Sequence, residues 1–329
     1  MSAAAAPAGF EHEAAFYRDE DEFLDLLSAY VREGLAQDDA VVVVEPRPRL
    51  ELLRTALGAD AADVGWFDML EVGANPGRII PLWADVVAEH AGTGRGLRGV
   101  GEPAHAGRRA AEFVECEIHE ALLNLAFGAG PPWRLLCPYD LRLPSAVQGV
   151  GMRTHPVWRD AERTAPSESW VPIGDGVDLG TLPASAPLPP PTDVVLRGEF
   201  GRRDVPAVRR TVRQFARSCA LSTEQADSLE LAASELASNC IRHGGGGGSV
   251  AMWRDPGAVV VEFTDSGRLT DPLVGRRRPH AQAEGGMGVY LVHQLCDLVQ
   301  VRSGPGGTTV RVSTWVRDDA PPAGRRPRA

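Results

Sequence analysis

Lysine is absent from this 329-residue chain, and all 34 of its basic side chains belong to arginine. The absence excludes mechanisms that depend on a lysine, such as a Walker-type phosphate loop or a Schiff base on a lysine amine. Cysteine is also scarce, with five residues scattered along the chain in no pairing pattern. Such spacing indicates reduced thiols, so we expect a cytoplasmic protein.

Long apolar runs are missing as well. The most apolar short run, residues 40–44, is far too brief to cross a bilayer, and the start of the chain lacks the basic and apolar regions of a signal peptide. Residues 1–193 carry 30 acidic groups against 15 arginines. We therefore expect no membrane segment, and the acidic half argues against nucleic acid as a ligand, because binding phosphates requires positive charge.

Prolines mark a boundary within a chain that is long enough for two domains. Five of them fall within residues 182–193, a density that favours an extended spacer. Together with the polar, weakly periodic stretch before it, this spacer predicts a linker over residues 159–193. The linker would join a domain over residues 10–158 to a second domain over residues 194–316, followed by a disordered tail over residues 317–329.

The first half alternates helical and strand-like patterns. Such alternation predicts an α/β domain with a mainly parallel sheet and helices on its faces. The expected helices cover residues 21–35, 48–57, 76–90 and 110–127, and the expected strands cover residues 41–44, 64–70, 97–101 and 133–137.

The second half predicts helices on one side of a mixed, largely antiparallel sheet. A loop rich in arginine, proline and glycine fills residues 268–286. The expected strands cover residues 194–200, 249–253, 258–263, 298–303 and 308–315, and the expected helices run from about residue 205 to 219, from 223 to 242 and from Gly288 onward.

Four motifs that could carry chemistry occur in the second half, two of them before residue 268. Glu235 and Asn239 are spaced by four, which puts both on one helix face. An asparagine oxygen suits Mg²⁺, and a nearby glutamate can take a proton from a hydroxyl or water. Asp265-Ser266-Gly267 closes a strand, where a carboxylate can accept from the adenine amine and glycine admits a flat ring. Alone, the first motif is common on helices and the second is usually a tight turn.

The other two motifs are glycine-rich. Gly286-Met287-Gly288 precedes a helical pattern, and glycines there expose amides at the positive end of a helix, which bind phosphate. Gly306-Gly307-Thr308-Thr309 begins a strand and offers hydroxyls to a base or a bridging water. Alone, these motifs indicate a flexible loop and an ordinary hairpin.

In this order and spacing, the four motifs resemble the Bergerat (GHKL, HATPase) ATP-binding fold, an α+β sandwich that gyrase, histidine kinases and mismatch-repair ATPases share. Residues 235–244 look like its N box, residues 263–272 like its first glycine box and residues 286–292 like its second. The short lid and compact domain most resemble the anti-sigma-factor serine kinases.

The resemblance implies a role for each matching residue, with ATP and Mg²⁺ as cofactors. Arginines 276–278 in the lid are further candidates for phosphate charge. The implied roles are Mg²⁺ binding for Asn239, the adenine amine for Asp265, approach of the base for Gly267, phosphates for Gly286 and Gly288, support of the adenine side for Thr309, and catalytic base for Glu235.

The first half resembles the MEDS sensory domain, through His12-Glu13-Ala-Ala-Phe-Tyr17, residues 99–103 and residues 114–121. The family is associated with sensing small, often hydrocarbon-derived molecules. His12, Glu102 and His119 are the candidates for a sensory pocket. Cys116 and His119 share a helix face and could bind metal, although packing roles are the more common explanation.

Together the resemblances predict a ligand-regulated, ATP-dependent protein serine/threonine kinase that acts on an anti-sigma antagonist or a sigma factor. One alternative is a non-catalytic ATP-binding module that sequesters a sigma factor, against which Glu235 argues. Another is a sensor histidine kinase, which needs an acceptor histidine on helices where this chain has prolines. The partner, the signal, the direction of regulation and homodimerisation are left open.

Overall fold

The computed structural model describes residues 9–174, 176–182, 184–191, 193–279 and 286–317. Its contacts divide the chain into two compact units. The first comprises Met1–Pro187 and Leu269–Gln294, and the second comprises Leu188–Arg268 and Leu295–Ala329. The predicted tail lies outside the described residues, apart from Arg317.

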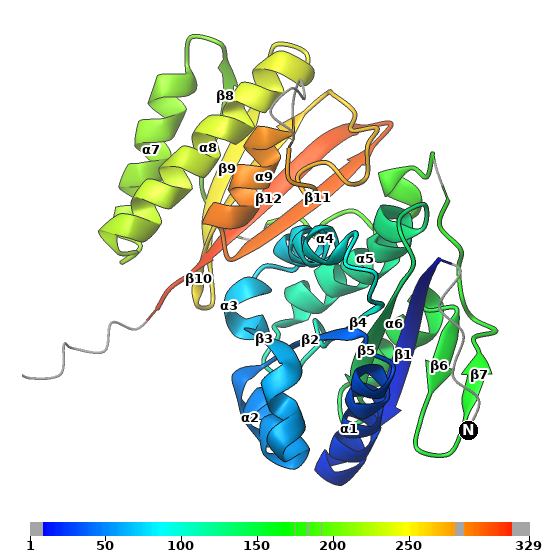
Figure 1. Cartoon of the computed structure of the whole chain (residues 1–329). Helices are drawn as coiled ribbons and strands as arrows, with labels where there is room; N and C mark the ends of the chain where they lie inside the picture. The colour runs from blue at the N-terminus through cyan, green and yellow to red at the C-terminus, as the bar shows by residue number, and fades with distance from the viewer. Residues whose placement is uncertain (1–8, 175, 183, 192, 280–285, 318–329) are drawn as a thin grey trace, which may run out of the picture. The chain divides into compact units, whose positions relative to one another are not determined.

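The first unit contains a seven-stranded sheet in the order β3-β2-β4-β5-β1-β6-β7 (Figure 1). All neighbouring strands pair in parallel except β6 and β7, which are antiparallel. The strands are β1 (Phe10–Tyr17), β2 (Ala40–Glu45), β3 (Val64–Asp68), β4 (Leu97–Gly101), β5 (Trp133–Asp140), β6 (Val157–Arg159) and β7 (Thr164–Pro166).

Helices cover both faces of this sheet, because strands such as β2 carry apolar side chains on both faces. The side chains of β2 alternate between faces, so Val41 and Val43 join one buried cluster while Val42 and Val44 join the other. The first cluster includes α1 (Glu20–Ala36) and α2 (Arg47–Leu57), and the second includes α4 (Ile79–His90), α5 (Ala110–Phe127) and α6 (Ser145–Thr154). The shorter elements are α3 (Met69–Val72), η1 (Gly58–Asp63), η2 (Pro76–Arg78) and η3 (Leu179–Thr181).

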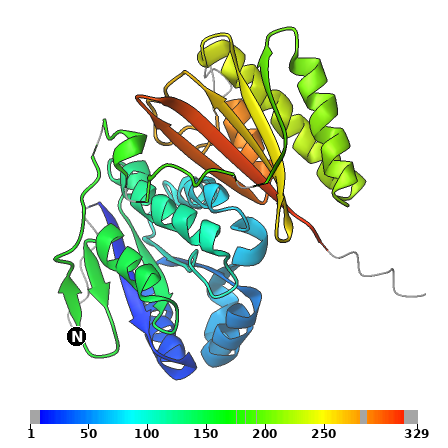
Figure 2. The ribbon, with the colours of Figure 1, turned by 180° about the vertical axis from the view of Figure 1, so that it is seen from behind.

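The second unit contains a five-stranded sheet in the order β11-β12-β10-β9-β8, and every pair in it is antiparallel. Figure 2 shows the two long helices α7 and α8 along one face of this sheet. The strands are β8 (Val194–Gly201), β9 (Gly247–Asp255), β10 (Ala258–Asp265), β11 (Leu298–Gly304) and β12 (Gly307–Trp315), and the helices are α7 (Val205–Ser218) and α8 (Thr223–His243).

The predicted fold classes are confirmed: the first unit is an α/β domain with a mostly parallel sheet, and the second combines helices with an antiparallel sheet. The sequence patterns missed β1, α6, β6 and β7, and the last two strands lie at or within the stretch predicted as linker. Among the described residues, no helix is both long enough and apolar enough to span a bilayer.

Candidate functional site

Helix α8 carries Glu235 and Asn239 in the second unit. The helix begins at a capping box, in which Ser222 Oγ accepts from the Gln225 amide and the Gln225 side chain accepts from the Ser222 amide, both at 3.1 Å. Glu235 and Asn239 are half-buried. In the described part of the chain, Glu235 forms no hydrogen bond or ion pair, so its carboxylate is available for chemistry.

Asn239 keeps its amide oxygen accessible. Within the described residues, the exposed Arg242 donates to it, with Nη2 at 3.3 Å from Asn239 Oδ1, a long and weak hydrogen bond. A half-buried neutral oxygen on a helix is a suitable ligand for Mg²⁺, which takes oxygen donors and keeps several waters. The residues present therefore fit the predicted ion.

Asp265 ends β10 and is held in place by its own turn. Its Oδ1 accepts from the Gly267 amide at 2.8 Å. Burial, and after it the hydrogen bond and charge of Asp265, raise the pKa of the Cys240 thiol on α8. The carboxylate therefore lies close to the Cys240 thiol of α8.

Two glycines allow this close approach of strand end and helix end. A Cβ on Gly244 would lie 2.4 Å from Asp265 Cγ, and a Cβ on Gly267 would lie 2.2 Å from the His243 carbonyl oxygen. Gly267 is therefore needed for packing, in addition to its predicted role beside the base. An open pocket begins here and is lined by Asp265, Ser266, Thr264 and the glycines at 244, 245, 247 and 248, among others.

The strand register separates the two threonines of the last motif. Thr308 is paired with Asp265 and Thr309 with Thr264. Directly paired residues point to the same face of a sheet. Thr308 thus lies on the Asp265 side, where its Oγ1 donates to the Gly267 carbonyl at 2.9 Å. The structure does not bring Thr309 to Asp265, since its Oγ1 lies 3.3 Å from that of Thr264. Thr308 was missed because two adjacent threonines cannot be told apart without the register.

Gly286 and Gly288 lie at the start of α9 (Met287–Leu295), which belongs to the first unit except for its last residue. Gly286 has a φ of +83°, a conformation that favours glycine. Its carbonyl oxygen accepts from the Tyr290 amide at 3.1 Å, so the helix begins directly after it. The predicted position of both glycines at a helix start is confirmed.

The carboxyl ends of the parallel strands gather a buried polar cluster around Glu102. Tyr17 Oη donates to Glu102 Oε1 at 2.8 Å, and Arg49 Nε lies 3.4 Å from Glu102 Oε2. Arg49 Nη2 also lies 3.1 Å from Asp140 Oδ2. Burial, and then the charge of Glu102, raise the pKa of Glu45 well above its usual value. We call these five residues the carboxyl-end cluster.

Comparisons with known proteins find two families along the chain, and the second match includes residues 269–294, which the contacts group with the first unit. A model of the MEDS family (methanogen/methylotroph, DcmR sensory domain) matches residues 11–156, and a model of the histidine kinase-like ATPase domain matches residues 201–314. This chain joins a MEDS domain to a histidine kinase-like ATPase domain. The two matched ranges lie inside the ranges predicted for the two domains.

Among solved structures, the chain is similar to a crystal structure of the RsbU and RsbW domains of a protein from Mycobacterium tuberculosis. The identity is 18%, the match covers 37% of this chain and 32% of that chain, and the TM-score is 0.28. The chain thus spans about a third of the length of that structure. No curated protein sequence matches the chain.

Two of the candidate sensory residues of the MEDS domain, His12 and Glu102, lie apart. Tyr17, which contacts Glu102, is five residues beyond His12 on β1, a separation of roughly 16 Å along a strand. His12 therefore lies near the opposite end of the sheet from the carboxyl-end cluster. The sequence motifs gave no sign of this separation. His12 lies on β1 and Glu102 directly follows β4, and the motifs do not show how these two strands are placed in the sheet.

His119 and Cys116 lie on α5, where both side chains are buried. Burial, followed by the charge of Arg276, lowers the pKa of His119 well below its usual value, so this imidazole is neutral. The Cys116 thiol donates to the Pro103 carbonyl at 3.2 Å. Among the described residues, this pair is not part of a group of three or more metal-binding side chains.

Two of the lid arginines are already paired within the first unit. Arg276 Nη2 lies 3.1 Å from Glu115 Oε2, and Arg278 Nη2 lies 2.6 Å from Asp85 Oδ2. Arg276 is buried together with Glu115. Since a buried pair is costly to break, the interpretation of Arg276 as a phosphate-binding residue is not supported by its contacts.

Proposed function

We propose that this chain is an ATP-dependent protein serine kinase that phosphorylates a partner protein of the anti-sigma antagonist class. A second proposal, that the partner is a sigma factor, rests on the same domain. The observation that carries the kinase proposal is the carboxylate of Glu235, which is unpaired among the described residues and lies one helical turn from Asn239, the proposed magnesium ligand. The match to a histidine kinase-like ATPase domain supports the nucleotide.

Phosphoryl transfer asks the protein mainly for positioning and for neutralising charge. Mg²⁺, when bound, supplies positive charge to the phosphates. Asn239 would hold this ion through Oδ1, and Asp265 would accept from the adenine amine and so fix the base. Glu235 would orient the serine hydroxyl of the partner and take its proton. Each of these groups is rigidly placed by α8 or by the end of β10, which favours a defined geometry.

The two alternative functions are less well supported. A nucleotide-binding module without catalysis has no need of an unpaired glutamate beside the magnesium ligand. A sensor histidine kinase needs an acceptor histidine on a helix just before the ATPase domain. In the described residues between 182 and 193, the chain forms no helix.

We further propose that the MEDS domain regulates the kinase through a small ligand. The carboxyl-end cluster supports this, because ligands of open α/β sheets bind at the carboxyl ends of strands. Buried groups with perturbed pKa values, such as Glu45, also mark functional sites more often than other positions.

Incubation of the full chain with ATP labelled on the γ-phosphate and with candidate antagonist proteins tests the proposal. We expect label on a serine of the antagonist, and we expect Glu235→Ala to lower the transfer rate by about 10²–10⁴-fold while ATP remains bound. Glu224→Ala is the matched control, because Glu224 is an exposed carboxylate in the first turn of the same helix.

Each other outcome points to a different function. Label on a histidine of this chain would indicate a histidine kinase. ATP binding without any transfer would indicate the non-catalytic module. Transfer that survives Glu235→Ala would remove Glu235 from the role of catalytic base.

A further inference from the structure

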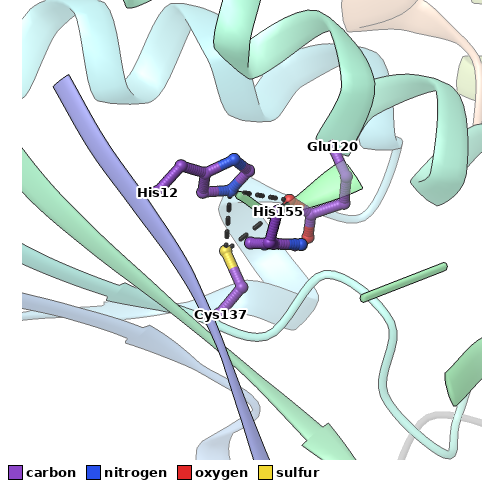
Figure 3. A group of neighbouring side chains, drawn as sticks. All are labelled: His12, Glu120, Cys137 and His155. Atoms are coloured by element: carbon purple, nitrogen blue, oxygen red, sulfur yellow. Dashed lines mark hydrogen bonds and ion pairs between the residues drawn. The ribbon is translucent and has the colours of Figure 1, made fainter. Parts of the chain in front are cut away.

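Four side chains with metal-binding atoms meet inside the MEDS domain (Figure 3). They are His12 from β1, Glu120 from α5, Cys137 from β5 and His155, which directly follows α6. All four are buried, and their ligand atoms lie within 4.8 Å of one another. We call them the His–Cys–Glu cluster. The kinase proposal and the carboxyl-end cluster make no use of it.

The proton on the His12 ring can be placed from its neighbours. Asn124 Nδ2 lies 2.8 Å from the Thr154 carbonyl oxygen and 3.3 Å from that of Glu120. Since carbonyl oxygens only accept, this atom is the amide nitrogen, and Asn124 Oδ1 faces His12 Nδ1 at 3.2 Å. His12 Nδ1 therefore donates, and Nε2 is directed into the cluster.

The same argument applies to His155. Its Nδ1 lies 2.9 Å from the Gly151 carbonyl oxygen and 2.9 Å from Thr154 Oγ1, whose own proton goes to the Val150 carbonyl. Nδ1 therefore donates, and Nε2 faces Glu120 Oε2 at 3.5 Å without forming a hydrogen bond. Histidine ligands of metals are held in this way, with the second ring nitrogen donating to an oxygen.

The cluster then has too few protons for its acceptors. With neutral rings, the two Nε2 atoms and Glu120 Oε2 all present lone pairs, and the Cys137 thiol has one proton to share. Glu120 is fully buried, and among the described residues its Oε1 has no hydrogen-bond partner and its carboxylate forms no ion pair with an arginine. A buried carboxylate needs a compensating charge.

Four of the six separations between the ligand atoms are close to those around a tetrahedral ion, and all six are within 4.8 Å. Bonds of about 2.0–2.3 Å at tetrahedral angles place donor atoms roughly 3.3–3.7 Å apart. The separations are 3.1 Å for His12 Nε2 to Glu120 Oε2, 3.4 Å for His12 Nε2 to Cys137 Sγ, and 3.6 Å for Cys137 Sγ to Glu120 Oε2. His155 Nε2 completes the group at 3.5 Å from the same Glu120 oxygen.

We propose that the His–Cys–Glu cluster binds a divalent transition-metal ion, and that Zn²⁺ is the ion whose preferences it fits best. Two imidazole nitrogens, a thiolate and a carboxylate are zinc ligands, and four protein donors leave no open position. On binding, the Cys137 proton is released to solvent. The ion joins β1, α5, β5 and the end of α6, so it stabilises the MEDS domain.

Metal uptake by the full chain tests this proposal. The chain, purified without a histidine tag and stripped with a chelator, is reloaded with Zn²⁺ or Co²⁺, and bound metal is measured by mass spectrometry. We expect stoichiometric uptake, a rise in the unfolding temperature and, with Co²⁺, the absorption of a tetrahedral thiolate complex. Cys137→Ser should abolish the thiolate band and weaken the metal affinity by at least about 10–100-fold. That is the loss caused by substituting a residue that only holds a metal ligand in place.

Cys116→Ser is the matched control, because Cys116 is equally buried and its thiol bonds to a backbone carbonyl. We expect it to bind metal as the original chain does. Asn124→Leu removes no ligand atom, so it keeps the test valid if Cys137→Ser fails to fold. It should weaken affinity by removing the acceptor for His12 Nδ1 and the bonds to the Glu120 and Thr154 carbonyls. A folded chain that takes up neither ion would overturn the proposal, as would uptake that none of these substitutions changes.

Discussion

The two domains place their polar groups differently. In the MEDS domain, the groups around Glu102 and Glu120 are buried and contact one another across strands. In the ATPase domain, Glu235, Asn239 and Asp265 are half-buried, and Glu235 is unpaired within the described residues. Buried polar groups contribute to the stability of the fold to the extent that they are paired, with one another or with a bound ion. Half-buried groups are left for a ligand, and substituting them should affect binding more than stability.

The largest effect that distinguishes the domains is expected at Asp265. Asp265→Asn keeps the size of the side chain and its bond to the Gly267 amide, but it removes the charge that we propose accepts from the adenine amine. A hydrogen bond to a charged group contributes about 1.5–3 kcal/mol, so ATP affinity should fall about 10–100-fold with little change in unfolding temperature. Calorimetry with ATP and GTP in the presence of Mg²⁺ measures this, and the preference for ATP should shrink.

Asp255→Asn serves as the control for that measurement, since Asp255 ends the neighbouring strand β9 and is exposed. Unchanged ATP affinity in Asp265→Asn would mean that this carboxylate does not contact the base. A large loss of stability in Asp265→Asn would mean that Asp265 supports the fold, as the buried groups of the MEDS domain do.

The opposite behaviour is expected for Glu45, whose substitution should affect stability. Burial and the charge of Glu102 raise the pKa of Glu45, while the charge of Arg49 lowers it. Tyr17 bonds to Glu102, and Asp140 is paired with Arg49. Because the pKa is higher in the folded chain, the protonated carboxyl contributes stability below the unfolded pKa, and this contribution is lost as pH rises through the folded pKa. Glu45→Gln cannot ionise, so it should gain stability relative to the original chain as pH rises.

Unfolding midpoints from about pH 5 to about pH 9 measure this gain, which should be on the order of 1 kcal/mol, since a one-unit change in pKa corresponds to about 1.4 kcal/mol. Glu51→Gln on the exposed side of α2 is the control and should follow the original chain. If Glu45→Gln also follows the original chain at every pH, the Glu45 carboxyl is ionised in the folded state.

The two domains also differ in how much of each site the sequence could predict. The ATPase motifs are local: Glu235 and Asn239 share one helix, and Asp265 and Gly267 share one turn. The MEDS clusters are not local, since His12 and Cys137 are 125 positions apart and meet because β1 pairs with β5. Helices and strands with a clear apolar period were predicted closely, whereas β1 was missed. Strand order is set by packing of the whole domain, which no local pattern contains.

The smallest effect, and the one that tests the register, concerns Thr308 and Thr309. Thr308→Val removes the donor to the Gly267 carbonyl and a hydroxyl beside Asp265, whereas Thr309→Val removes a hydroxyl on the other face. One neutral hydrogen bond contributes about 1 kcal/mol, so ATP affinity should fall about fivefold in Thr308→Val. Thr309→Val should bind ATP as the original chain does. The reverse result would place Thr309 beside the nucleotide, as the resemblance implied, and would require a strand register shifted by one residue, which turns every side chain of β12 to the other face.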